Sequence, residues 1–116
     1  IEMTQHCIFC TLGSQADSNS TLYCDDSIYA IKDINPRSPT HILVIPLMHI
    51  SDLGTTHIGS EKLLGHILHV AAKLAESQGI ADSGYRLVIN QGYDAGQEIE
   101  HLHVHVIGGR TLGSMG

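Results

Sequence analysis

Three histidines stand at alternate positions in the stretch HLHVHVIGGR, residues 101–110. Successive side chains of a strand point to opposite faces, so His101, His103 and His105 would share one face while the apolar residues between them enter the core. Imidazole is suited to proton transfer and nucleophilic attack near neutral pH. A polar, solvent-facing surface is the alternative interpretation, although Thr, Lys or Glu would satisfy it more simply. The row therefore indicates a chemical site.

Zinc is one candidate use of such a row, but the geometry of a strand limits it. Side chains two residues apart on a strand are separated by about 6 to 7 Å, and those four apart by about 13 Å. Zinc binds an imidazole nitrogen at about 2.1 Å, so it could gather two of the three histidines and not all three. At least one histidine is left for proton transfer or nucleophilic attack.

The residues around this row favour a small phosphate ester as the ligand. The preceding stretch QGYDAGQEIE, residues 91–100, offers Gly92, Gly96 and backbone amides, which can approach an anion closely. Asp33 lies between apolar neighbours, where a carboxylate could accept hydrogen bonds from two sugar hydroxyls. A turn residue or a helix cap is the alternative interpretation of Asp33. The residues alone thus predict an imidazole-centred site that handles a small phosphate ester.

The stretch CIFC separates Cys7 from Cys10 by two residues. Two thiolates at this spacing are a ligand pair that tetrahedral zinc accepts, but they make only half a site. Two ordinary buried cysteines beside a short helix are the alternative, and we expect Cys24 to be a core residue. The residues alone leave both possibilities open.

Charge and composition exclude several classes of protein. The formal net charge is −6, with Lys and Arg numbering 6 together, and these are too scattered to form a basic surface for nucleic acid. Backbone amides, imidazoles and Arg110 remain as the groups that could hold a phosphate. The longest apolar run, residues 42–48, is too short to cross a bilayer, and the N-terminus lacks a signal-peptide pattern. We therefore expect a cytoplasmic protein that binds neither nucleic acid nor membrane.

The first half of the chain must supply the strands that surround the histidine row. The stretch CIFCTLGSQADSNS predicts a short helix followed by a polar turn, and TLYCDDS with IYAIKDI predicts a hairpin that turns at Asp25 and Asp26. The apolar, β-branched stretch THILVIPLMHI predicts a central, well-buried strand that Pro46 closes.

The second half predicts one long helix and two strands. Leu63, Ile67, Val70 and Leu74 recur at helical spacing between Ser60, a plausible N-cap, and Gly79, a C-terminal stop. The stretches YRLVIN and HLHVHVI predict the last two strands. No role is predicted for four of the other histidines, His6, His57, His66 and His69.

Length and element order together predict the fold class. A chain of 116 residues suits a single domain, residues 1–116. The strands occur as a hairpin, a single strand and a final pair whose loop is too short for a parallel crossover. We expect a largely antiparallel sheet with helices on one face, which is a two-layer α+β fold.

With these residues in place, the sequence resembles a known family. HLHVHVI fits the signature of the histidine triad (HIT) superfamily, and GGR, PTHILVIP and NQGYDAGQE resemble its Hint branch. The resemblance runs in order from Cys7 to Arg110. It implies a five-stranded antiparallel sheet with one long helix and a short N-terminal helix, and a homodimer in which two such sheets join. It also implies a purine nucleotide in a pocket on each subunit.

The resemblance further implies the catalytic residues. His103 would be the nucleophile that becomes nucleotidylated, with its other ring nitrogen oriented by the carbonyl of His101. His105 would contact the phosphate, and His41 would be the further histidine of the site. The implied nucleotide-binding residues are, besides His103 and His105, the ribose carboxylate Asp33, the base wall Ile31 and Ile34, and the phosphate-side residues Asn90, Gly96, Gln97 and Glu98.

The resemblance also completes the zinc site that the cysteine pair leaves half made. Relatives with this pair often use the histidine of a PxxHI turn and the first histidine of the triad. Here these are His49 and His101, so a structural zinc bound by Cys7, Cys10, His49 and His101 is expected, and no catalytic metal. Glu98 and Ile31 depart from relatives that carry a serine and an aromatic at these positions.

The expected function is hydrolysis of purine nucleoside 5'-phosphoramidates, such as adenosine 5'-phosphoramidate, through a covalent nucleotidyl-histidine intermediate. A dinucleoside polyphosphate hydrolase is one alternative. A non-catalytic nucleotide-binding or zinc protein is the alternative from another class.

Overall fold

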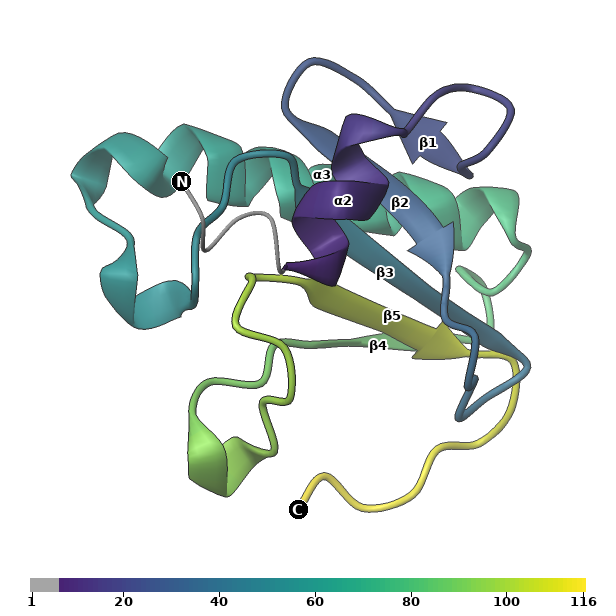
Figure 1. The fold of residues 1–116 in the computed structure, drawn as a ribbon. Helices are drawn as coiled ribbons and strands as arrows, with labels where there is room; N and C mark the ends of the chain where they lie inside the picture. The colour runs from purple at the N-terminus through teal and green to yellow at the C-terminus, as the bar shows by residue number, and fades with distance from the viewer. Residues whose placement is uncertain (1–6) are drawn as a thin grey trace.

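A computed structural model describes residues 7–116 as one five-stranded sheet with helices packed on it (Figure 1). The strand order is β1-β2-β3-β5-β4, and every neighbouring pair is antiparallel. The strands are β1 (Tyr23–Cys24), β2 (Ile28–Lys32), β3 (Thr40–Pro46), β4 (Tyr85–Val88) and β5 (Val104–Gly108). The predicted hairpin is β1 with β2, and the predicted central strand is β3, whose residues 41–46 are all buried.

The helical elements complete the predicted α+β fold. They are the short helix α2 (Ile8–Ser14), the long helix α3 (Glu61–Ser77) and three 3-10 turns, η1 (Leu53–Thr55), η2 (Ile58–Ser60) and η3 (Tyr93–Ala95). The five-stranded antiparallel sheet, the long helix and the short N-terminal helix are therefore confirmed. Within the described part of the chain, no helix combines the length and apolar character needed to cross a membrane.

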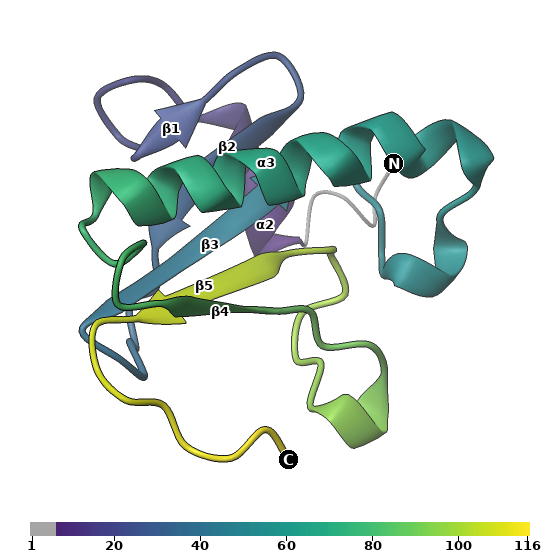
Figure 2. The same ribbon diagram turned by 180° about the vertical axis from the view of Figure 1, so that it is seen from behind.

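The two faces of the sheet are covered by different helices. On one face α3 buries Ile67, Val70 and Leu74 against a core that includes Val44 and Val106 (Figure 2). On the other face lies α2, which stands in front of the sheet in Figure 1. The expectation of helices on one face is therefore wrong for α2.

The apolar side chain of Phe9 explains why α2 packs where it does. Phe9 is buried with Tyr29, Leu43 and Ile45, whose side chains alternate with those that face α3. The Tyr29 hydroxyl also donates a hydrogen bond to the Phe9 carbonyl at 2.6 Å. A seven-residue helix cannot be stable alone, so this apolar contact holds it on the second face.

The strand predicted for residues 101–107 begins three residues late, at Val104. Its ladder with β3 ends at the pair Val44 and Val104. Before that pair, the Leu102 amide donates to the Ile50 carbonyl at 2.6 Å, and the His101 ring bonds the Pro46 carbonyl at 2.8 Å. These contacts replace the ladder, so the first histidine is drawn away from the regular strand.

Two of the histidines without a predicted role have structural ones. His57 caps η2 by accepting from the Gly59 amide at 3.0 Å, whereas Ser60 stands at the N-cap position of α3 without a side-chain capping bond. His66 on α3 bonds Asp25 in the β1–β2 turn at 2.7 Å. Ser60 was the predicted cap, and its hydroxyl instead accepts from the His57 amide.

The remaining minor predictions have mixed outcomes. His69 is exposed, and Cys24 is half-buried against the core on the α2 face. His6 lies outside the described residues. Because residues 1–6 are not described, one domain over residues 1–116 stays a prediction.

Candidate active site

Three imidazoles meet on the face of the sheet that carries α2. His41 is the second residue of β3, and His105 stands on β5 directly opposite Leu43, so the two histidines are diagonal neighbours. Their ring centroids are 5.1 Å apart, and those of His103 and His105 are 5.0 Å apart. The structure thus brings together the second and third histidines of the predicted row with His41.

His103 is oriented by a backbone carbonyl. Its Nδ1 lies 2.7 Å from the carbonyl oxygen of His101. A carbonyl can only accept, so Nδ1 carries the proton and the neutral ring presents an unprotonated Nε2. Phe9 packs edge-on against the ring, with centroids 5.1 Å apart. The geometry leaves the lone pair of Nε2 as the reactive group of His103.

His41 is oriented by a backbone amide. The amide of Arg37 donates to Nδ1 of His41 at 3.0 Å, so a neutral His41 carries its proton on Nε2. Nε2 lies 2.9 Å from Nδ1 of His105 and 3.3 Å from Oδ2 of Asp33. Donation from His41 to His105 leaves the His105 proton on Nε2. His105 therefore presents an N–H at Nε2, whereas His103 presents an unprotonated Nε2.

The protonation equilibria agree with neutral rings at these positions. Burial lowers the pKa of His105 to about 4, with further lowering by His103 and His41 that outweighs the opposing effect of Asp33. Burial also lowers the pKa of His41, although Asp33 acts in the opposite direction. Both imidazoles are therefore neutral at pH 7, as the chain of hydrogen bonds requires.

A cavity of about 580 Å³ opens onto these imidazoles. Its walls contain eight of the nine residues predicted to bind nucleotide, together with His41. The eight are Ile31, Asp33, Ile34, Asn90, Gly96, Glu98, His103 and His105. Ile34 is 92% exposed, so an apolar surface stands open at the cavity wall. A volume of this size accommodates a small organic ligand.

Gln97 and Arg110 are not part of this wall. The Gln97 amide group donates to the Ser51 carbonyl at 3.0 Å, and its oxygen accepts from the Gly92 amide at 2.9 Å. These bonds hold the loop before β5, so the structure does not bring Gln97 toward the cavity. Arg110, which the sequence left as a group for phosphate, bonds the Arg37 carbonyl at 2.9 Å instead.

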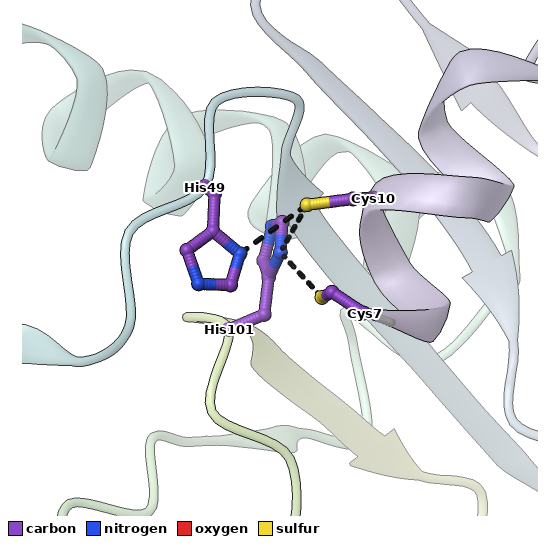
Figure 3. Close-up of side chains that lie close together, drawn as sticks. All are labelled: Cys7, Cys10, His49 and His101. Atoms are coloured by element: carbon purple, nitrogen blue, oxygen red, sulfur yellow. Dashed lines mark hydrogen bonds between the residues drawn. The ribbon is translucent and has the colours of Figure 1, made fainter. Parts of the chain in front are cut away.

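A second cluster lies beside the first, where α2 meets the segment before β5 (Figure 3). Donor atoms of Cys7, Cys10, His49 and His101 all lie within 4.8 Å of one another. Sγ of Cys7 is 3.3 Å from Nδ1 of His101, and Sγ of Cys10 is 3.2 Å from Nδ1 of His49. The structure thus brings together all four predicted metal ligands.

A family model for the HIT domain matches residues 14–112. The chain belongs to the histidine triad (HIT) family. The predicted resemblance is thereby confirmed on a match that covers most of the chain.

Relatives of known name extend this finding. A purine nucleoside phosphoramidase of Escherichia coli strain K12 is 42% identical over 113 residues, which are 97% of this chain and 95% of the relative. A solved HIT family hydrolase from Legionella pneumophila Philadelphia 1 has a TM-score of 0.88 and 38% identity, over 93% of this chain and 96% of that one. A zinc-bound histidine triad family protein from Mycobacterium smegmatis has a TM-score of 0.76 and 29% identity, over 92% and 77% of the two chains. The expectation of a HIT-family hydrolase is confirmed.

The donor set of this HIT chain fits a structural zinc ion. Zinc bonded to sulfur at 2.3 Å and nitrogen at 2.1 Å would hold these atoms about 3.6 Å apart, close to the distances of 3.2, 3.3 and 3.5 Å found here. The His101 Nε2 donates to the Pro46 carbonyl, which leaves Nδ1 unprotonated for a metal. Burial, with the neighbouring Cys7 thiol, raises the pKa of Cys10 to about 11, so a cation would be needed to stabilise the thiolates.

Asp33, His41 and His105 form another group whose donor atoms lie within 4.8 Å. In this HIT site the three groups are joined by the hydrogen bonds described above. The tautomers of the two rings permit these hydrogen bonds, and the hydrogen bonds explain why the three groups lie close together.

Three contributors to the site were not found from the sequence. Phe9 and Leu43 form apolar wall beside the imidazoles, and both could have been found from the alternation of β3 and the apolar face of α2. The Arg37 amide could not have been found from the sequence. Every residue except proline has a backbone N–H, so no residue type indicates which of these amides meets an imidazole.

Proposed function

We propose that this HIT-family chain hydrolyses purine nucleoside 5'-phosphoramidates to nucleoside monophosphates, with His103 as the nucleophile. The observation that carries the proposal is the bond from His103 Nδ1 to the His101 carbonyl, which leaves Nε2 unprotonated in a cavity that also contains His105. The naming of the Escherichia coli relative as a purine nucleoside phosphoramidase supports this substrate class.

In the first step, Nε2 of His103 attacks the α-phosphorus of the substrate and forms a P–N bond. The bond between phosphorus and the leaving amine breaks, and the amine departs with the electron pair and takes up one proton. Nε2–H of His105 donates to a phosphate oxygen as the charge shifts. The products of this step are the free amine and a nucleotidyl-histidine.

In the second step, water attacks the same phosphorus and the bond to His103 breaks. The electron pair returns to Nε2, and one proton is released, which balances the proton taken up by the amine. His103 is regenerated in its starting tautomer because the His101 carbonyl still holds Nδ1–H. One difficult displacement is thus replaced by two easier ones.

The cavity walls supply the binding groups for such a substrate. Asp33 is assigned to the ribose hydroxyls, and the exposed apolar surface of Ile34 with Ile31 to the purine. Asn90 and Gly96 are assigned to the phosphate side. The carboxylate of Glu98 is exposed at the cavity and is assigned to the leaving group, where it would favour an amine over a pyrophosphate because like charges repel.

A structural zinc and a homodimer belong to the same proposal. Cys7, Cys10, His49 and His101 would hold zinc with all four positions filled, so the metal would pin α2 to the active-site segment without binding water. Homodimerisation would join two sheets, and a light-scattering mass measurement of the purified protein tests it.

The enzymatic proposal is tested by steady-state hydrolysis of adenosine 5'-phosphoramidate beside diadenosine polyphosphates, with and without chelator. We expect turnover of the phosphoramidate, with the same initial rate in the presence of chelator at moderate temperature. Preference for the polyphosphates would favour a dinucleoside polyphosphate hydrolase. Turnover of neither substrate would favour a nucleotide-binding or zinc protein without catalysis.

A further inference from the structure

The loop at residues 34–39 is attached to the last residue of β5 and to Arg110, which follows it. The Arg110 guanidinium donates to the Arg37 carbonyl at 2.9 Å, across 73 residues of sequence. The Gly108 amide donates to the Ser38 hydroxyl at 3.3 Å. Gly109 has a φ of +96°, and a Cβ on it would lie 2.9 Å from Pro39. Gly109 therefore allows the close approach that places Arg110 on the loop.

Arg37 is held at both of its backbone polar groups. Its amide donates to Nδ1 of His41, and its carbonyl accepts from Arg110. Movement of the loop away from Arg110 would carry the amide away from His41. His41 would then lose the donor that keeps a proton off Nδ1, and only Asp33 and His105 beside Nε2 would direct its tautomer. Its bond to His105 would lose part of its direction.

We propose that Arg110 is a positioning residue for catalysis, which holds the Arg37 amide on His41 and thereby fixes the tautomers of His41 and His105. This inference rests on the proposed function for its effect on turnover, because the donor role of His105 requires those tautomers. Arg110 acts on the reaction through the loop, since its side chain is not part of the cavity wall.

Other hydrogen bonds hold the two ends of the loop, whereas the Arg37 carbonyl between them is bound by Arg110. Asp33 accepts from the Asn35 amide at 2.8 Å at the start, and the Ser38 hydroxyl bonds the Thr40 carbonyl at the end. Because these bonds remain when Arg110 is replaced, the loop should keep its general path. The expected loss is therefore local and falls on the amide that meets His41.

Because Arg110 lies on the surface, its effect on catalysis can be measured separately from an effect on global stability. Arg110 is exposed, and an exposed hydrogen bond contributes little to global stability. Arg86 supplies a matched control, because its guanidinium also donates to a distant backbone carbonyl, that of Gly113, at 3.1 Å. The two arginines differ in that only the carbonyl bound by Arg110 belongs to a residue that touches an imidazole of the site.

The kinetic test compares Arg110→Ala, Arg110→Lys and Arg86→Ala in the full chain, with adenosine 5'-phosphoramidate as substrate. We expect Arg110→Ala to lower kcat by about three- to tenfold, with KM and the melting temperature nearly unchanged. Arg110→Lys should recover part of the loss, because an ammonium can still donate to the Arg37 carbonyl. Arg86→Ala should match the wild type.

A spectroscopic test reads the tautomers directly, without any substrate. Long-range ¹H–¹⁵N correlation spectra of the histidine rings distinguish a protonated from an unprotonated nitrogen. His41 should carry its proton on Nε2 in the wild type and in Arg86→Ala, and should become a mixture of both tautomers in Arg110→Ala.

The two tests separate this inference from the proposed function. If the wild type hydrolyses neither class of substrate, the proposed function fails while the spectra still decide the role of Arg110. Unchanged ring spectra in Arg110→Ala would overturn the inference. So would a rise in KM with kcat unchanged, which would make Arg110 a substrate contact, or an equal loss in Arg86→Ala.

Discussion

His101 and His103 are joined by a 2.7 Å hydrogen bond from the His103 ring to the His101 carbonyl, while the His101 ring turns into the Cys/His cluster. One residue therefore acts through its backbone on the proposed nucleophile and through its side chain on the proposed zinc. His101 is fully buried, so both directions are fixed by packing. Substitutions of the ring and displacement of the backbone should have different consequences.

Replacement of His103 by Ala should abolish hydrolysis while nucleotide binding is nearly retained, because the assigned ribose and base contacts lie on other residues. A slowly hydrolysed substrate should leave a nucleotidyl adduct on the wild type and none on His103→Ala, as intact-mass spectrometry would detect. His69→Ala, an exposed histidine on α3, is the matched control. Near wild-type turnover by His103→Ala would refute covalent catalysis by this residue.

The two flanking histidines should separate metal binding from phosphate handling. His101→Ala removes a metal ligand but leaves a backbone carbonyl for His103, so it should lose zinc and stability and retain some activity. His105→Ala should keep its zinc and lose most of its turnover. Metal content by elemental analysis and kcat on the same preparations test both statements. Equal loss of metal in the two variants would mean that the triad is assigned incorrectly.

Removal of the zinc should lower the melting temperature before it lowers the rate. The ion would join Cys7 to His101 across 94 residues, and its ligands converge only on folding, so its binding free energy becomes folding free energy. Chelation should lower Tm by about 5 °C or more, with little change in rate at moderate temperature.

Cysteine variants supply the controls for this experiment. Cys7→Ser combined with Cys10→Ser should reproduce the chelated state, after which chelator should have little further effect. Cys24→Ser removes a half-buried thiol outside the cluster and should keep the metal. Protein purified without chelator that contains no zinc, or a Tm indifferent to both treatments, would reduce Cys7 and Cys10 to ordinary buried cysteines.

Asp25 should stabilise the fold in a pH-dependent way. Burial acts to raise its pKa, but bonds from Tyr23, His66 and the amides of Ser27 and Ile28 outweigh burial and lower the pKa well below its usual range. A lowered carboxyl pKa in the folded state gives stability that is complete above the unfolded value, about 3.9, and is lost as the pH falls toward the folded value. Asp25→Asn should therefore lower the free energy of unfolding by about 1 to 2 kcal/mol at pH 7.

The pH series decides this prediction. Urea unfolding at pH 7 and below pH 4 should show that the difference between wild type and Asp25→Asn shrinks in acid. Asp26→Asn, at the exposed neighbouring position, should differ little from the wild type at either pH. A difference of constant size across the series would show that the loss does not come from the carboxylate charge.

Strand and helix positions were predictable from the sequence because apolar periodicity dominates them. Six of the seven residues of β3 are buried, on both faces of the sheet, and its continuous apolar run indicates this directly. The helical spacing from Leu63 to Leu74 likewise predicts α3 to within one residue at each end. The membership of the two histidine clusters followed from the family motif rather than from spacing.

Details that depend on tertiary contacts were not predictable in this way. The face on which α2 packs is decided by the fit of Phe9 among Tyr29, Leu43 and Ile45, which no local pattern encodes. The late start of β5 coincides with the bonds of the His101 ring to the Pro46 carbonyl and of the Leu102 amide to the Ile50 carbonyl, which join segments far apart in the sequence. Gln97 has the residue type of a phosphate contact, but the backbone groups of Gly92 and Ser51 bind its side-chain amide instead.

The amide of Arg37 has a consequence for mutagenesis. Alanine replacement at residue 37 would leave the N–H in place, so a conventional side-chain scan would report only on the guanidinium, which lines the cavity, and would miss the main-chain donor to His41. Only a change in the backbone itself, by proline or by an ester link in a semisynthetic chain, removes that donor. Selection on residue 37 would accordingly act on the conformation of the loop. The tolerance of this position to side-chain substitutions would understate how much the imidazoles depend on its main-chain amide.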